Sequence, residues 1–337
     1  MRADISYPDI DNSFKGGANM KKVMAALMMI SAVMLSSCAE IIEINERAFV
    51  RAMALDRSGD MIKATLMIGD TGKGGGTVSG EGNTAAEALR AAELSLPDGS
   101  NLFIGHTQVF VAGRNITPDR KLVRLLTAEY GLSPSCLVVS AFDGGDAVSE
   151  MSGDAEEKLK FSERQGRIKA VTFADICRRD TGGFSAVPFA DISGENITFD
   201  TTSFISPSGG KTILTEKENS GYMLLSGHGK GMMLNVSTSC GYGALTVTDI
   251  SSDIGFAKEN GKIICRADIH ADVKAEEKCG RAGKDIPRDE TLILSAERSA
   301  EECCEALFDK TSAWQIICVG AEISGAEYSA VSVSISM

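Results

Sequence analysis

Hydrophobic and polar residues alternate in some parts of the chain and recur at helical spacing in others. This pattern predicts two strands, at 47–56 and 61–69, joined by a turn at 57–60. The apolar residues of the second strand share one face, so this hairpin is expected to open a sheet. The stretch 70–82 that follows is rich in glycine and predicts a loop.

Two amphipathic helices carry start signals. Thr84 and Glu87 have the spacing of a capping box, and the helix that they open is expected to stop before Pro97. The segment 117–119 is expected to open a second helix, which ends at Gly131. Strands are predicted at 102–105, 107–113 and 136–142, followed by a short helix at 146–151. Alternating strands and helices predict an α/β layer from Glu40 to about Arg179.

Beyond a glycine- and proline-containing boundary at 181–188, the pattern changes to strands and turns. Strands are predicted at 196–206, 211–217, 221–236, 244–250, 263–275 and 328–337. A helix over about 295–310 is expected to cover the resulting antiparallel sheet. The predicted fold class is α+β, with two or three mixed α/β domains in series: an N-terminal α/β layer, then a mainly antiparallel sheet with a covering helix.

The stretch 20–40 reads as an export signal. Lys21 and Lys22 precede an apolar run of 13 residues, 23–35, which is shorter than the ~20 residues that a membrane span needs. The run ends in Leu35-Ser36-Ser37-Cys38, which resembles the lipobox of bacterial lipoproteins. Cys38 is therefore expected to become a diacylated N-terminus. The alternative is a buried helix that happens to contain a cysteine.

The offset of this signal has its own interpretation. Residues 1–19 are polar and precede a second methionine in a better context, which indicates a wrongly placed start or an extension lost on processing. Residues 1–37 are thus set apart from the expected domains at 38–185 and 190–337. No later segment reaches 18 apolar residues, so the tether is expected to be the only anchor.

Composition restricts the class of partner. The expected mature chain has 337 − 37 = 300 residues, long enough for two domains. A net charge of −12 argues against nucleic acid or an anionic lipid surface as partner, because both reward a basic patch.

Candidate chemistry is sparse. Either of His106 and His228 could be a ligand or a base, but neither has a cysteine or acid at fixed local spacing, so a structural role is favoured. His270 lies on the polar face of its predicted strand and is expected to be solvated. Lys73 and Lys211 do not complete a phosphate-binding loop. Eight cysteines besides Cys38 are expected to be buried thiols more often than disulfides. The sequence thus predicts no catalytic, cofactor or metal site, and a binding module remains favoured over a lipid-anchored hydrolase.

Three separated stretches resemble one family, the GerAC-type spore germination lipoproteins. The first follows the lipobox cysteine, and the second combines Gly80-Glu81-Gly82 with Gly105-His106. The likeness of the first lies in Glu43-Ile44-Asn45, Arg47-Ala48-Phe49-Val50 and Ala54-Leu55-Asp56, and that of the third in Glu218, Gly221, Leu224-Leu225, Gly227, Lys230 and Gly231. Their order along the chain makes the set specific.

The resemblance implies a non-enzymatic C subunit of a nutrient germinant receptor. Such a subunit is held by a diacylglyceryl anchor on the outer face of the spore inner membrane, and acts with integral-membrane A- and B-type subunits. The chain departs from the family where Ala39-Glu40 replaces Trp-Asp after the lipid cysteine, and where only Trp314 remains in a shortened C-terminal region. A solute-binding or envelope-assembly lipoprotein unrelated to germination is the alternative.

Overall fold

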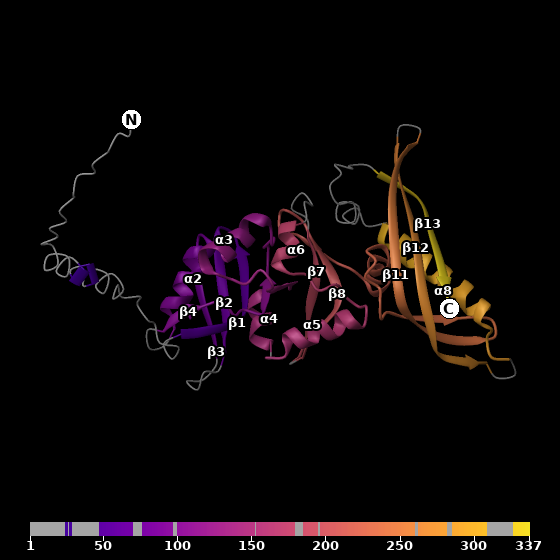
Figure 1. Cartoon of the computed structure of the whole chain (residues 1–337), viewed down its shortest axis with the longest axis horizontal. Helices are drawn as coiled ribbons and strands as arrows, with labels where there is room; N and C mark the ends of the chain where they lie inside the picture. Colours follow the sequence, from indigo (N-terminus) through magenta and orange to yellow (C-terminus); the bar gives the residue numbers. More distant parts are fainter. Residues whose placement is uncertain are drawn as a thin grey trace, which may run out of the picture. The chain divides into compact units, whose positions relative to one another are not determined.

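The computed structural model divides by its contacts into Met1–Ile44 and Asn45–Met337. The structure describes residues 24, 25, 27, 28, 47–69, 76–96, 100–151, 153–178, 185–194, 196–259, 262–281, 285–308 and 326–337 (Figure 1). Cys38, most of the leader before it and Trp314 lie outside these residues. Within the described part, no helix combines the length and apolar character that a membrane crossing requires.

The described strands form two sheets, which confirms the α+β class. The first sheet has the order β3-β2-β1-β5-β6-β7-β8-β9, with β4 also paired to β1. Its strands are β1 Arg47–Ser58, β2 Met61–Ile68, β3 Gly76–Gly82, β4 Asn101–Phe103, β5 Val109–Ala112, β6 Leu137–Ser140, β7 Ser185–Ser193, β8 Asn196–Ile205 and β9 Lys211–Ile213. Strands β4 and β5 run parallel to β1, and β6 and β7 continue in the same direction, whereas β2, β3, β8 and β9 form antiparallel pairs.

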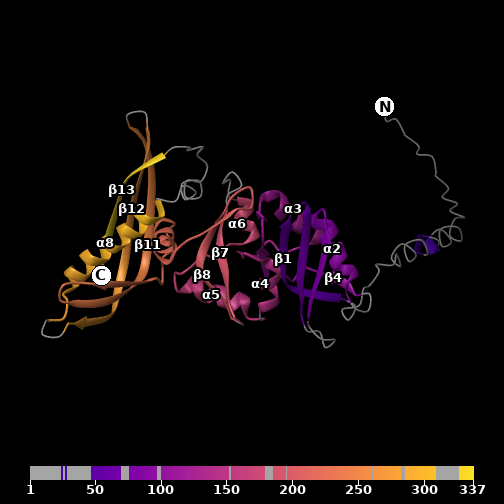
Figure 2. The ribbon, with the colours of Figure 1, turned by 180° about the vertical axis from the view of Figure 1, so that it is seen from behind.

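Helices cover both faces of this sheet (Figures 1 and 2). One buried cluster joins the sheet to α2 Ala85–Leu94, α3 Arg120–Tyr130 and α6 Phe173–Arg178, and the other joins it to α4 Gly144–Glu150 and α5 Ala155–Arg164. Strands β5 and β6, in the middle of the parallel part, are buried on both faces, so their residues are almost all apolar instead of alternating. Helices α5 and α6 were not predicted from the sequence.

The prediction of a loop over the glycine-rich stretch is wrong at 76–82, which forms the edge strand β3 beside β2. Its glycines allow α2 to lie directly on the strand. A Cβ atom at Gly80 would lie 2.1 Å from the Ala92 nitrogen, and one at Gly82 would lie 2.4 Å from the Glu87 Cβ. The glycines therefore serve close packing of helix on strand.

The capping signals were found, with shifts of one or two residues. The Thr84 hydroxyl accepts the Glu87 N–H as predicted, but the Glu87 carboxylate accepts the N–H of Asn83. Helix α3 is capped by Asp119, not by Thr117, since the Asp119 carboxylate accepts the Leu122 N–H at 2.8 Å. The helix ends at Gly131 in the left-handed conformation, as predicted.

The second sheet has the order β10-β11-β12-β13 among the described strands. These are β10 Met233–Ser237, β11 Gly241–Glu259, β12 Lys262–Gly280 and β13 Ala326–Ser336, with α7 Glu216–Leu225 and α8 Asp289–Phe308 packed on it. The predicted alternation of β12 is confirmed where its side chains are described: Ala267, Ile269, Ala271 and Val273 are buried. One expectation is corrected, because β13 runs parallel to β12.

The strand predicted over 221–236 is wrong at 221–225, which belong to helix α7, and only 233–236 lie in a strand, β10. Its start signal was present in the sequence: Thr215 accepts the Glu218 N–H, and Glu218 accepts the Thr215 N–H. The change from one sheet to the next falls between Ile213 and Met233, since β7 joins the first sheet across the expected boundary at 185–190. The two-domain division itself remains a prediction.

Candidate functional site

Asp56 joins three segments at the carboxyl edge of the parallel strands. It ends the predicted Ala54-Leu55-Asp56 element on β1. Its Oδ1 accepts the main-chain N–H groups of Arg114, at 2.6 Å, and Gly144, at 2.9 Å, and its Oδ2 accepts that of Gly145 at 3.0 Å. The carboxylate thus fixes the chain after β5 and the first turn of α4.

Glycines make room for this carboxylate. A Cβ at Gly113 would lie 2.0 Å from Asp56 Oδ1, and one at Gly144 would lie 2.9 Å from Asp56 Oδ2. In open α/β sheets, ligands commonly bind where the carboxyl ends of parallel strands meet. Here that position is filled by the protein's own carboxylate.

Lys211, the first residue of β9, reaches the same position. Its Nζ donates a hydrogen bond to the Gly113 carbonyl oxygen. Burial lowers the pKa of Lys211 to about 8, and the nearby Asp56 carboxylate opposes that shift. The lysine that failed as a phosphate-binding residue in the sequence therefore has a structural role beside Asp56.

The stability of the fold is expected to depend on this lysine at alkaline pH. Its pKa is about 8 when folded and near the ordinary 10.5 when unfolded, so the unfolded chain binds more protons between these values. The contribution of Lys211 to stability should therefore rise as pH increases from about 8 to about 10.5, and be constant below pH 8. We expect the urea midpoint of the wild type to rise relative to that of Lys211→Met between pH 7.5 and pH 9.5. A difference between the two midpoints that stays the same over this range would contradict the prediction.

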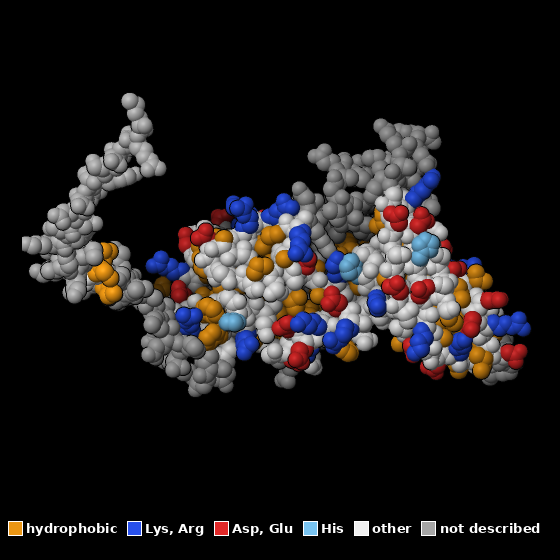
Figure 3. All heavy atoms as spheres, in the orientation of Figure 1, with side chains coloured by type: hydrophobic (Ala, Val, Ile, Leu, Met, Phe, Trp, Pro, Cys, Tyr) orange, Lys and Arg blue, Asp and Glu red, His pale blue; other side chains and the backbone are white. Residues whose placement is uncertain are grey.

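A groove of about 940 Å³ opens beside Asp56, between α2 and α3. Its apolar wall includes Ile62, Leu122 and Leu125, and its polar rim carries basic side chains. The rim bases are Arg57, Lys121 and Arg124. Figure 3 shows Lys and Arg side chains gathered over α3 beside apolar ones. An apolar floor with a charged rim is typical of a surface that binds another macromolecule or an amphipathic ligand.

The groove floor is held by a long-range contact. The Thr117 hydroxyl donates to the Ser206 carbonyl oxygen at 2.8 Å, which joins the chain before α3 to the turn between β8 and β9. Asn115, with φ 51°, is in the left-handed region and donates from Nδ2 to the Arg57 oxygen. Gly209 lies so close that a Cβ there would be 2.5 Å from Asn115. The groove is therefore built by residues about 90 positions apart, which sequence reasoning had no means of joining.

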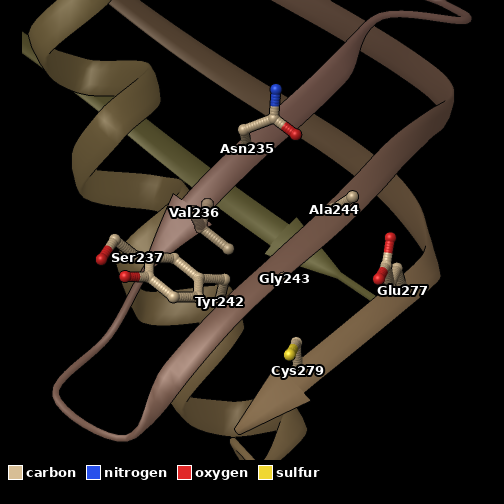
Figure 4. A pocket seen from close by; sticks show the side chains of 8 residues that line it. All are labelled: Asn235, Val236, Ser237, Tyr242, Gly243, Ala244, Glu277 and Cys279. Atoms are coloured by element: carbon tan, nitrogen blue, oxygen red, sulfur yellow. The ribbon is translucent and has the colours of Figure 1, made fainter. Parts of the chain in front are cut away.

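A second depression, of about 460 Å³, lies on the second sheet (Figure 4). Side chains of Asn235, Tyr242 and Glu277 line it together with the exposed thiol of Cys279. The Arg281 guanidinium lies 5.0 Å from the centre of the Tyr242 ring. The Cys279 thiol donates to the Gly280 carbonyl oxygen, so it is bonded to the main chain and not to a base.

The three histidines lie in three different environments. His106 lies against Phe49 and Phe103, the His228 Nδ1 contacts the Ser226 oxygen at 2.5 Å, and His270 contacts the Ser334 hydroxyl. Among the described residues, no group of three histidine, cysteine or acidic side chains could hold a metal ion. Cys136 and Cys304 are free thiols whose pKa values are raised by burial.

Comparison with known proteins gives one family match. Residues 40–179 match the model described as the spore germination protein N-terminal domain. A solved structure, described as the crystal structure of the GerBC protein, aligns with a TM-score of 0.46 and 13% sequence identity, over 86% of this chain and 98% of that chain. The search of curated proteins gives no match. Residues 40–179 of this chain are thus similar to the N-terminal domain of spore germination proteins.

Proposed function

We propose that this protein is the lipid-anchored, non-catalytic C subunit of a nutrient germinant receptor, on the outer face of the spore inner membrane. The observation that carries the proposal is the family match over residues 40–179. In this assignment the chain acts beside integral-membrane A- and B-type subunits, and Cys38 carries the diacylglyceryl group.

The sequence before the matched region supports the anchor. The lipobox-like Leu35-Ser36-Ser37-Cys38 ends two residues before the family match begins at residue 40. A lipid anchor holds a protein stably when two acyl chains or two membrane signals act together. A diacylated Cys38 would supply the two chains.

The way in which the site uses its charged groups supports a binding role. Both oxygens of Asp56 accept main-chain N–H groups, and Lys211 donates to a main-chain carbonyl. These groups organise loops instead of facing a reacting atom. The open, apolar groove between α2 and α3 is the surface that we assign to a partner subunit of the receptor.

The anchor is tested by replacing Cys38 with alanine in cells supplied with radiolabelled palmitate. The wild-type chain should carry label and sediment with membranes, and Cys38→Ala should lose both. Retention of label and of membrane association by Cys38→Ala would contradict the lipoprotein assignment.

The alternative, a solute-binding or envelope-assembly lipoprotein, is separated from the proposal by gene context. Two adjacent genes for integral-membrane proteins of germinant-receptor type are expected. A neighbouring transporter permease in their place would contradict the receptor assignment.

A further inference from the structure

The amino end of the parallel strands, opposite to Asp56, carries a patch that the receptor assignment does not use. Chain connectivity places this end next to the expected anchor. Arg47, the first residue of β1, comes nine positions after Cys38, and such a length of chain spans at most roughly 30 Å. Whatever Arg47 contacts therefore lies close to the lipid that Cys38 would enter.

Aromatic and basic side chains meet there. Strand β4 runs beside β1 and pairs Phe49 with Phe103. The two rings lie 5.4 Å apart, His106 lies 5.3 Å from Phe103, and the Arg47 guanidinium lies 5.2 Å from the Phe103 ring. In Figure 3, basic, apolar and histidine side chains lie side by side near β4. None of these side chains is fully buried, although three of them are aromatic.

The end of α2 extends this patch. Leu94 is 80% exposed. It borders a groove of about 610 Å³ together with Arg90, Leu102 and Tyr130. Glu93 also lines the groove, and its carboxylate accepts the Leu102 N–H at 3.1 Å. We call these residues the amino-end patch: Arg47, Phe49, Arg90, Leu94, Phe103, His106 and Tyr130.

We propose that the amino-end patch lies on the phospholipid bilayer, with Leu94 and the aromatic rings at the acyl boundary and the two arginines at the phosphates. This rests on the proposed membrane anchor. Aromatic rings and long basic side chains favour the membrane interface, since each combines an apolar body with a polar tip. Every phospholipid carries a phosphate, with which the two arginines can form hydrogen bonds. This local contact does not require a basic protein, and the whole chain has a net charge of −12.

This contact would determine the orientation of the protein on the membrane, which a lipid anchor alone does not. A flexible tether would hold the protein near the membrane in any orientation. Contact through the amino-end patch fixes one orientation, in which the amino edge of the sheet faces the bilayer. Asp56 and the groove between α2 and α3 then face away from the lipid, at the other end of a strand of 12 residues.

Quenching of a single tryptophan by brominated phospholipids tests this contact. Trp314→Phe removes the chain's one tryptophan, and Leu94→Trp or Leu294→Trp then places one on an exposed helix position. Leu294 is the matched control, because it is 66% exposed on α8. The full lipidated chain is reconstituted in phosphatidylcholine–phosphatidylglycerol vesicles. We expect quenching of Leu94→Trp to exceed that of Leu294→Trp by about twofold or more.

The controls separate the contact from the anchor. Co-sedimentation with vesicles reports the anchor. If Cys38 is not acylated, an amino-terminal histidine tag and a nickel-chelating lipid hold the same chain on the vesicles, so the comparison is made in either case. Equal quenching at the two positions, or none, would overturn the proposal while leaving the anchor intact. Quenching of Leu94→Trp that appears only when membrane subunits are reconstituted with the chain would also overturn the proposal. The patch would then contact a protein and not the lipid.

Discussion

Asp56→Asn is expected to lower the free energy of unfolding by about 2–4 kcal/mol, the largest effect that we predict in the first sheet. An asparagine has one carbonyl oxygen, whereas the Asp56 carboxylate accepts three N–H groups through two oxygens. The amide NH₂ would have to face at least one main-chain N–H, and the negative charge at the first turn of α4 would be lost.

Urea unfolding measures this loss, and Asp60→Asn is its matched control. Asp60 is exposed in the turn between β1 and β2, so its substitution should change stability by about 0.5 kcal/mol or less. Equal effects of the two substitutions would show that the carboxylate does not organise the carboxyl edge of the sheet.

Gly221→Ala is expected to destabilise the C-terminal region by about 3 kcal/mol, although alanine is the better helix former by about 1 kcal/mol. Gly221 lies in α7 where α8 crosses it. A Cβ at this position would lie 2.2 Å from the Cys303 carbonyl oxygen and 2.6 Å from the Cys303 carbonyl carbon. The obstacle is main chain, which no change of rotamer can relieve, so the two helices would have to separate.

Gly76→Ala serves as the control for this substitution. Gly76 begins β3, and a Cβ there would meet no atom within 4 Å. Thermal or urea unfolding of the two variants should therefore differ by more than about 2 kcal/mol. A neutral or stabilising Gly221→Ala would contradict the close packing of α7 on α8.

The elements that sequence reasoning found are those whose signals are local. The apolar face of α2, the left-handed end of α3 at Gly131 and the alternation of β12 each depend on neighbours a few residues away. Such signals survive without knowledge of the fold. Helix α7 was missed although its local signal was present. Thr215 and Glu218 have the spacing of a capping box, but the segment was interpreted as a strand.

The candidate site was missed for a different reason. The hydrogen-bond partners of Asp56 lie 58, 88 and 89 residues away, and Lys211 lies 98 residues from the carbonyl that it contacts. Gly113 and Gly144 looked like ordinary loop glycines. Both glycines leave room for the Asp56 carboxylate. This shared role is visible only after the parallel strands are placed side by side. In retrospect, an acid ending one strand and glycines ending the next two was the available signal.

The resemblance to germination lipoproteins supplied what periodicity could not. Several of its residues now have physical roles in the described structure. Gly80 and Gly82 admit α2, Asp56 organises the carboxyl edge, and Gly221 admits α8. Gly231, with φ 88°, lies where a Cβ would be 2.1 Å from the Arg164 carbonyl oxygen. These residues are thus needed for packing and for loop structure in this chain.

Germination of spores that lack this chain tests the central claim most directly. Spores complemented with the wild-type gene should lose optical density in response to their nutrient, whereas spores without the gene, or with Cys38→Ala at equal protein level, should respond at a small fraction of that rate. Both should germinate normally when a non-nutrient trigger bypasses the receptor. An unchanged nutrient response in the deleted strain would contradict the assignment to a germinant receptor, and full rescue by Cys38→Ala would contradict the role of the lipid anchor.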